Sequence, residues 1–269
     1  MKLIYFLLFL IFVSQVNAQD IDAPYIRVHY DTKFKKYKDS KSFSSDERIL
    51  DIGKHTSKFY SRWETRNEEI KDSIFSRGGN LQELRNFMGK SGCPRSYSYY
   101  EVYKNYPETG KLTYIDKEYN WYKYEEKMEK PIWTIIPSER AVVADYSCQK
   151  AETTFRGRKW IVWFTIDIPV NDGPWKLYGL PGLILEAEDE KKEFSFRCIE
   201  LRNIQNKMIN VPKRKYQKCT RESFKQQITK SAKDPEGYLR QLGVFVGKAY
   251  DAQGRPMKSD EKEPIFMDK

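Results

Sequence analysis

Apolar and polar residues alternate along several stretches of this chain, which is the pattern of half-buried β-strands. The clearest stretch is 160–168, whose apolar face contains Trp160, Val162, Phe164, Ile166 and Ile168. Two later stretches, Leu183–Glu188 and Glu193–Leu201, are joined by the polar residues 189–192. That arrangement predicts a β-hairpin with a polar turn.

The N-terminal half contains further strand-like stretches. Residues 26–38 alternate so that Tyr30 lies on an apolar face and His29 is expected to face water. Residues 49–61 predict a second strand, and later ones are expected at 97–104, 112–117, 119–124, 131–137 and 141–151. In the last of these, one face should contain Val142, Ala144, Tyr146 and Cys148.

Helical spacing appears in two places. Residues 63–76 and 80–88 repeat apolar residues at helical intervals and are separated by Gly78 and Gly79. Near the end, Thr220 is a suitable N-cap for a helix over 221–231, and Asp234 is a suitable cap for a helix that follows it. Two short helices are therefore expected to close the fold.

Composition favours strands over helices for the rest of the chain. Aromatic residues make up 15% of the sequence and include 19 tyrosines, and aromatic side chains favour strands. We expect a β-rich α+β fold in which a curved antiparallel sheet, or a half-barrel, has a few short helices. Residues 19–250 should form a single domain, and the charged segment 251–269 should be a disordered tail.

The first eighteen residues have the layout of a secretory signal peptide, with Lys2, an apolar run and a small residue at Ala18. The apolar run is too short to span a bilayer, which takes about 20 residues. No cysteine stands at or near the cleavage point, so a lipid anchor is not expected. The sequence thus predicts an exported protein without a transmembrane span, soluble in the periplasm or outside the cell, that begins at Gln19.

The net charge of the whole chain is +10. Basic residues interleave with aromatics at 33–38 and 213–218, as they would in a nucleic-acid binder. For an exported protein, solvated surface is the simpler interpretation, and nucleic acid is not an expected partner. Attraction to an anionic membrane surface is more compatible with this charge.

All four cysteines, Cys93, Cys148, Cys198 and Cys219, lie after the leader. An even number in an exported chain predicts two disulfides, and three connectivities are available. We favour Cys148 with Cys198, because both fall on apolar faces of expected strands, which leaves Cys93 with Cys219. Buried free thiols are the alternative. The spacing does not fit a zinc site.

Proline and glycine are concentrated between the two strongest strand patterns. Pro181 and Gly182 suit the central positions of a type II turn, in which the glycine has a positive φ. Gly179 allows close backbone approach. Leu180 and Leu183 flank the turn and are expected to anchor it in the core, and another bend is expected at Gly173, Pro174 and Trp175.

This segment resembles the GLPGLI family of exported Bacteroidetes proteins, whose naming motif is complete at Gly179, Leu180, Pro181, Gly182, Leu183 and Ile184. The similarity is strong over residues 141–200 and loose elsewhere, and it includes the stretches 146–151, 155–158, 163–165, 168–169 and 173–176. The resemblance implies export and, because such proteins are often encoded beside TonB-dependent outer-membrane transporters, an accessory role in the envelope. Proline, glycine and leucine bring no acid, base, nucleophile or metal ligand, so the motif is expected to form a structural turn, and a contact with a ligand or partner is the alternative.

The sequence offers little to a catalytic mechanism. It has only two histidines, His29 and His55, and it lacks the common nucleophile, nucleotide and metalloprotease motifs. Glu186, Glu188 and Asp189 are close enough in sequence for a carboxylate pair, but charged residues at a strand end usually face solvent. The sequence therefore predicts no catalytic residue, no metal site and no cofactor.

Three functional hypotheses remain. The first is a binding protein that presents an aromatic surface to an outer-membrane transporter or another envelope component. The second is a carrier of a hydrophobic ligand, which requires a deep apolar cavity of several hundred Å³. The third is a carboxylate-based hydrolase, which requires two carboxylates converging in a cleft.

Overall fold

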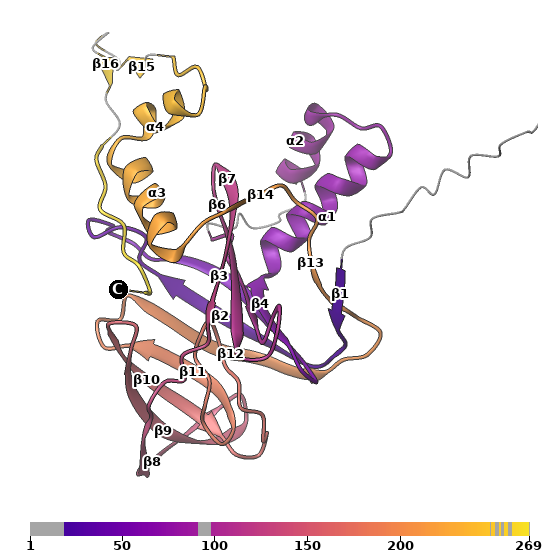
Figure 1. The fold of residues 1–269 in the computed structure, drawn as a ribbon, viewed down its shortest axis with the longest axis vertical. Coiled ribbons are helices and arrows are strands. Elements are labelled where there is room, and N and C mark those ends of the chain that lie inside the picture. The colour runs from indigo at the N-terminus through magenta and orange to yellow at the C-terminus, as the bar shows by residue number, and fades with distance from the viewer. Residues whose placement is uncertain are drawn as a thin grey trace, which may run out of the picture.

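One large, curved sheet of twelve strands is the main feature of the computed structural model, which describes residues 19–90, 98–247, 249–250, 253, 256–257 and 260–268 (Figure 1). Its strands are arranged in the order β14-β7-β6-β5-β4-β3-β2-β12-β11-β10-β9-β8. Every neighbouring pair is antiparallel except β14 with β7. The two outermost described strands do not pair with each other, so the sheet stays open. The expected fold class is confirmed.

The sheet consists of two meanders, each built from strands that are consecutive in sequence. The first contains β2 (Pro24–Phe34), β3 (Ser44–Gly53), β4 (Ser57–Ser61), β5 (Glu101–Lys104), β6 (Lys111–Glu118) and β7 (Asn120–Lys127). The second contains β8 (Thr134–Val143), β9 (Tyr146–Phe155), β10 (Arg158–Thr165), β11 (Leu183–Asp189) and β12 (Phe194–Asn203). The meanders are joined where β2 pairs with β12.

Shorter strands complete the β structure. The pair β1 (Gln19–Asp22) and β13 (Ile209–Val211) is antiparallel, as is the pair β15 (Ala249–Tyr250) and β16 (Pro256–Met257). The strand β14 (Tyr216–Lys218) runs parallel to β7 at one edge of the large sheet.

Two pairs of helices lie at the same end of the molecule (Figure 1). They are α1 (Arg62–Ser76) with α2 (Leu81–Lys90), and α3 (Arg221–Lys233) with α4 (Pro235–Gln241). The expected caps are confirmed, because the Thr220 side chain accepts a hydrogen bond from the backbone N–H of Ser223 and the Asp234 side chain accepts one from Gly237. Each cap satisfies a backbone donor that the first helical turn leaves unpaired.

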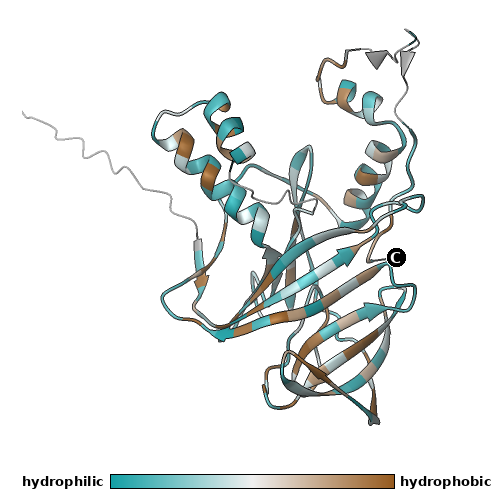
Figure 2. Cartoon of the chain, turned by 180° about the vertical axis from the view of Figure 1, so that it is seen from behind, coloured by the Kyte–Doolittle hydropathy of each residue, from teal (hydrophilic) through white to brown (hydrophobic). Residues whose placement is uncertain are grey.

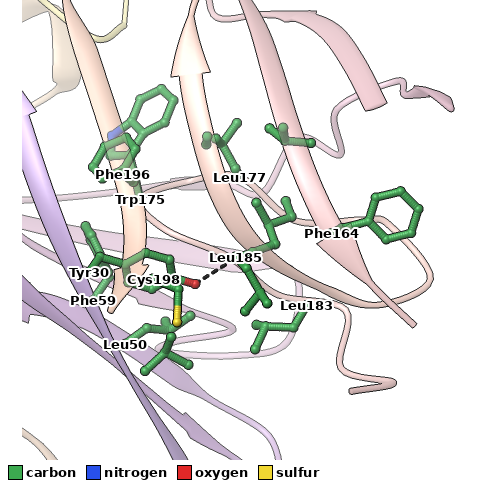
Figure 3. Close-up of a cluster of buried hydrophobic side chains, with 14 of the residues drawn as sticks. Tyr30, Leu50, Phe59, Phe164, Trp175, Leu177, Leu183, Leu185, Phe196 and Cys198 are labelled. Atoms are coloured by element: carbon green, nitrogen blue, oxygen red, sulfur yellow. Dashed lines mark hydrogen bonds between the residues drawn. The ribbon is translucent and has the colours of Figure 1, made fainter. Parts of the chain in front are cut away.

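The main hydrophobic core lies on one face of the sheet, and apolar and polar residues alternate along the strands that enclose it (Figure 2). Aromatic and aliphatic side chains from both meanders meet there, including Tyr30, Phe59, Phe164 and Phe196 (Figure 3). The Tyr30 hydroxyl donates a 2.7 Å hydrogen bond to the carbonyl of Ile184. This bond links the second strand of the chain to the family motif.

The opposite face of β5 and β6 carries a second, smaller core. It contains Tyr103, Tyr106 and Ile115 together with Ile209 and Val211 of β13. Partly buried Ile21, Trp121 and Tyr216 pack against it. The first meander therefore has buried side chains on both of its faces.

The prediction that His29 faces water is wrong, because its side chain is only 3% exposed. The flanking strands β3 and β12 place Glu47 and Glu200 on either side of the ring. His29 Nδ1 lies 2.6 Å from Glu47 Oε1, and Nε2 lies 3.8 Å from Glu200 Oε2. Neighbouring acidic side chains thus cover a residue that its own strand pattern assigns to solvent.

Two expected strands differ in detail. The stretch 141–151 belongs to β8 and β9, which are joined by a turn at Ala144 and Asp145 with φ of 49° and 68°. As a result, Val142 is 71% exposed whereas Cys148 is fully buried. Similarly, β10 ends at Thr165, and Ile166 is 62% exposed although the alternation places it on the apolar face.

The ends of the chain complete the picture. The expected leader, residues 1–18, lies outside the described residues. No described helix is long and apolar enough to cross a membrane. Residues 260–268, which belong to the segment expected to be disordered, run beside Lys36 and Lys38 and make defined hydrogen bonds there.

Candidate functional site

The first four residues of the family motif, 179–182, lie in the segment 166–182, which fills the interior of the curved second meander. Trp175 packs against Trp160 and Phe155, with ring centroids 5.5 and 6.0 Å apart. Leu177 and Leu180 are also fully buried, and Leu183 at the start of β11 is buried as expected. We call residues 166–182 the plug segment, because their apolar side chains fill the space inside the second meander.

The two motif glycines have the opposite roles to those expected. Gly182 has no positive φ, so the expected type II turn is not formed there. A Cβ on Gly182 would stand 2.0 Å from the carbonyl oxygen of Thr165, so the position needs glycine for space. Gly179 instead has the positive φ, 105°. At Gly173 an added Cβ would stand 2.8 Å from the Cβ of Ile184.

Buried charges hold this plug in place. The Lys104 ammonium binds the Asp172 carboxylate and donates to the carbonyl oxygens of Gly173 and Leu177. Burial lowers the pKa of Lys104, and the charge of Asp172 opposes that change. All three acceptors lie in one loop, so this lysine fixes the loop path. Lys104 and Asp172 are both buried, so this ion pair is not presented to solvent.

A cavity of about 190 Å³ provides a better candidate site. It lies between the inner face of the first meander, α3 and residues 264–267. Its lining includes Arg48, Tyr99, Tyr100, Tyr114, Asp116, Lys117, Phe194, Phe196, Ile228 and Ile265. A more open groove continues from it past Tyr119 and Lys262, and the two share seven lining residues, among them Lys36, Tyr37 and Lys117.

Arg48 forms part of the cavity wall although its side chain is only 1% exposed. Its guanidinium carbon lies 3.5 Å from the centroid of the Tyr100 ring. The same group donates to the Tyr100 carbonyl at 2.9 Å, and to the Ser98 carbonyl and hydroxyl at 2.9 and 2.7 Å. A buried cation with planar stacking is a use that suits arginine and not lysine.

Asp116 contributes a carboxyl group whose pKa is raised to about 7. Burial is the main cause, and it is opposed by hydrogen bonds from the Lys117 N–H at 2.8 Å and the Tyr114 hydroxyl at 3.1 Å, and by the charge of Arg48. Asp116 can therefore be either a hydrogen-bond donor or an anion near neutral pH. A strongly perturbed acid in a cavity is a common mark of a functional site.

Aromatic rings form the remaining walls. Tyr114 is stacked between Tyr100 and Tyr124, with centroid distances of 5.7 and 4.9 Å. The Lys117 ammonium lies 5.2 Å from the ring centroid of Tyr99, next to the mouth shared with the groove. The cavity thus combines aromatic walls with a basic opening.

No local pattern in the sequence indicates this cavity, since its walls come from segments spread between residues 32 and 267. One indirect signal exists. Arg48 lies on the same face of β3 as Leu50 and Ile52. Asp116 lies on the same face of β6 as Leu112 and Tyr114. Leu50, Ile52 and Leu112 belong to the main core, so both charged residues occupy positions where an apolar side chain is expected.

The three carboxylates considered from the sequence do not converge. Asp189 is buried and binds Arg158 at 2.7 Å and the N–H of Phe194 at 2.7 Å. Glu186 and Glu188 are half-buried, and Glu186 lies 3.7 Å from Arg197. By strand alternation Glu186 and Glu188 lie on one face of β11 and Asp189 lies on the other, so the three carboxylates do not share a cleft.

Cys148, Cys198 and Cys219 are free thiols, and Cys93 lies outside the described residues. The favoured Cys148–Cys198 disulfide is therefore not formed in this structure. Burial raises the pKa of Cys148 to about 11 and that of Cys198 to about 12. No group of three or more His, Cys, Asp or Glu residues that could hold a metal ion occurs in the described part of the chain.

Comparison with known proteins gives a family match over part of the chain. A Bacteroidetes family described as "Protein of unknown function (Porph_ging)" matches residues 118–186, from the end of β6 to the middle of β11. The match contains the plug and the whole of the motif at 179–184. No curated protein matches the chain.

Two solved structures are similar in fold. They are "Structure of PNGF-II in P21 space group" and "Structure of PNGF-II in C2 space group". Each has a TM-score of 0.50 and 14% sequence identity, and the alignment covers 78% of this chain. It covers only 34% of the PNGF-II chain, so this protein spans about a third of that length. At this identity the likeness concerns the fold alone.

Proposed function

We propose that this chain is an exported binding protein of the bacterial cell envelope, of the GLPGLI type, and not an enzyme. It holds a side-chain-sized group of its partner in the cavity beside Arg48 and Asp116. The observation that carries this proposal is the cavity itself, in which a buried arginine and an acid with a pKa of about 7 stand among aromatic walls.

The size of the cavity indicates what it can accept. Sites for whole small molecules usually measure roughly 300–1,000 Å³, whereas this cavity measures about 190 Å³. An aromatic or aliphatic side chain fits such a volume, and the groove that continues past Lys36 can hold the chain on either side of it. Lysines at the opening favour a partner segment with acidic residues.

The carrier hypothesis has less support. Trp175, Leu177 and Leu180 occupy the interior of the second meander, where a lipid would have to lie. The groove beside the cavity is open and lined by charged residues such as Lys117, Glu118 and Asp260. Both features suit a protein partner better than an apolar ligand.

The hydrolase hypothesis depends on Asp116. Its raised pKa would suit a general acid, and the nearest carboxylate in the cavity lining is that of Glu118. Glu118 already accepts a hydrogen bond from the Ser231 hydroxyl. The cavity of about 190 Å³ is smaller than the usual site for a whole small-molecule substrate, so we rank catalysis below binding.

An outer-membrane transporter is the partner that the family resemblance favours. Photo-crosslinking in the native host tests this directly. The photoreactive residue p-benzoylphenylalanine replaces Lys36, which is exposed beside the cavity, and adducts are identified by mass spectrometry. We expect a discrete adduct with an outer-membrane transporter or another envelope protein.

The matched control places the same residue at Lys159, an exposed lysine on β10 that does not line the cavity. It should give no such adduct. Identical adducts at both positions, or none at Lys36, would remove the support for a partner at the cavity. A lipid adduct at Lys36 alone would favour the carrier.

A further inference from the structure

The C-terminal strap, which we define as residues 260–268, binds to the sheet as an extended peptide would. Its Ile265 N–H donates to the Lys36 carbonyl, and its Glu263 carbonyl accepts from the Lys38 N–H, both at 3.0 Å. The pattern is that of an antiparallel bridge between Tyr37 and Pro264. Addition of a strand-like segment to a sheet is a general mode of peptide recognition.

Side chains of the strap add specific contacts. Ile265 and Met267 pack against the main core. Between them, the Phe266 carbonyl accepts two hydrogen bonds from Arg158, at 3.0 and 2.7 Å. The Asp268 carboxylate then binds the Lys176 ammonium at 2.7 Å. The site thus recognises two apolar residues, separated by one position, followed by an acidic residue.

Arg158 and Lys176, the two cations that bind the strap, also have acidic partners outside it. Arg158 also binds Asp189 at 2.7 Å and Glu193 at 2.6 Å. Lys176 also binds Glu126 at 2.8 Å. Release of the strap would therefore leave neither buried charge unpaired, which would otherwise make release very unfavourable.

The strap also fills its site incompletely. The cavity of about 190 Å³ lies against Pro264–Met267, and a second cavity of about 50 Å³ is lined by Phe266, Met267 and Asp268. Oδ1 of Asp268 is buried with no hydrogen-bond partner among the described residues. A peptide with a larger or better-placed side chain could make contacts that the strap does not.

We propose that the site beneath the strap binds an extended peptide segment of a partner protein, with the pattern apolar, any residue, apolar, acidic, and that the strap is its internal competitor. This inference rests on the proposed binding function and names the class of partner. The order of residue types in this pattern is that of Ile265, Phe266, Met267 and Asp268. Its acidic residue would pair with Lys176, as Asp268 does.

Competition between a labelled peptide and the strap tests the proposal on the full chain. The probe is a fluorescein-labelled synthetic peptide that copies residues 260–269, and its binding is followed by fluorescence anisotropy. In the strap variant, Ile265→Ser with Met267→Ser, we expect the probe to bind about tenfold or more tightly than to the wild type, since the internal copy no longer competes. A milder variant, Asp268→Asn, retains both apolar anchors and should give a smaller gain.

The matched control is Val244→Ser with Phe245→Ser, which changes two apolar residues that are 46% and 94% exposed and outside the strap. It should leave probe binding at the wild-type level. Equal binding by the wild type and both strap variants would overturn the proposal, as would equal binding of a probe with scrambled order. A wild-type dimer that the strap substitutions abolish would show that a second copy is the occupant, and would overturn a partner peptide.

The two proposals fail in different ways. A specific adduct at Lys36 without any gain in probe binding would retain the cavity function and remove the strap proposal. A gain in probe binding without a Lys36 adduct would leave a peptide site whose natural partner is not reached from that position, and would count against the cavity function alone.

Discussion

Gly182 and Thr165 approach each other so closely that no side chain fits between them. A Cβ on Gly182 would stand 2.0 Å from the Thr165 carbonyl oxygen and 2.7 Å from its carbonyl carbon. The contact closes the plug segment against the end of β10. It explains why the second glycine of the motif leaves no room for a side chain.

Gly182→Ala should therefore destabilise the protein strongly. The backbone must shift to accept one methyl group, and we expect a loss of more than about 3 kcal/mol in the free energy of unfolding, measured by urea denaturation. Gly89→Ala is the control, because Gly89 lies in α2 with nothing within 4 Å of an added Cβ. It should stabilise the protein by about 0.5–1 kcal/mol. Similar losses for both variants would contradict the tight contact.

Asp116 should make stability depend on pH. Its pKa is about 7 in the folded state and 3.8 without the fold, so the folded state binds a proton more tightly and loses stability as pH rises from about 4 to about 7. Asp116→Asn removes this cost. We expect the variant to exceed the wild type by about 2–4 kcal/mol at pH 8 and to match it near pH 4.

The measurement is urea denaturation of both proteins across this pH range. Asp145→Asn, in the exposed turn between β8 and β9, controls for the loss of one negative charge. A difference between wild type and Asp116→Asn that stays constant from pH 4 to pH 8 would show that Asp116 does not titrate in this window.

Arg48→Lys should destabilise the cavity wall. A lysine ammonium cannot stack on Tyr100 and at the same time reach the carbonyls of Tyr100 and Ser98. We expect a loss of about 2–3 kcal/mol in the free energy of unfolding. Arg197→Lys is the control, because that side chain is 64% exposed and lies 3.7 Å from its acidic partner. A change beyond about 0.5 kcal/mol there, or none at Arg48, would argue against this account.

Cys148 and Cys198 should react slowly with alkylating reagents. Their thiols are buried, and pKa values of about 11 and 12 leave little thiolate at pH 8. We expect iodoacetamide to modify both only after unfolding in urea, as measured by peptide mass spectrometry without reduction. Recovery of a peptide linked through Cys148 and Cys198 would instead show the disulfide that the sequence pattern favoured.

Local signals explain what the sequence predicted correctly. The caps at Thr220 and Asp234 act within one helical turn, so their residues suffice to place α3 and α4. The alternation at residues 160–165 and the polar turn at 189–192 likewise define β10, β11 and β12 from neighbouring residues. The curved sheet follows from the abundance of such stretches.

Contacts between distant segments explain the rest. The structure exchanges the roles that the sequence predicts for Gly179 and Gly182. The close approach of Gly182 to Thr165 depends on how β10 and β11 pair, which composition does not reveal. His29 is buried by acids from two other strands. The turn at Ala144 and Asp145 has positive φ at residues other than glycine, so it lacks the glycine or proline that usually marks a turn in a sequence.

The junction of β2 with β12 has a consequence for the order of folding. Within each meander, neighbouring strands follow one another along the chain. In contrast, β2 pairs with β12, so Tyr30 lies opposite Cys198 although most of the chain separates these two residues. Closing so long a loop is entropically costly, and topologies with distant pairings fold slowly. We therefore expect the two meanders to form separately and first during folding. The pairing of β2 with β12 should then be the late step that limits the folding rate.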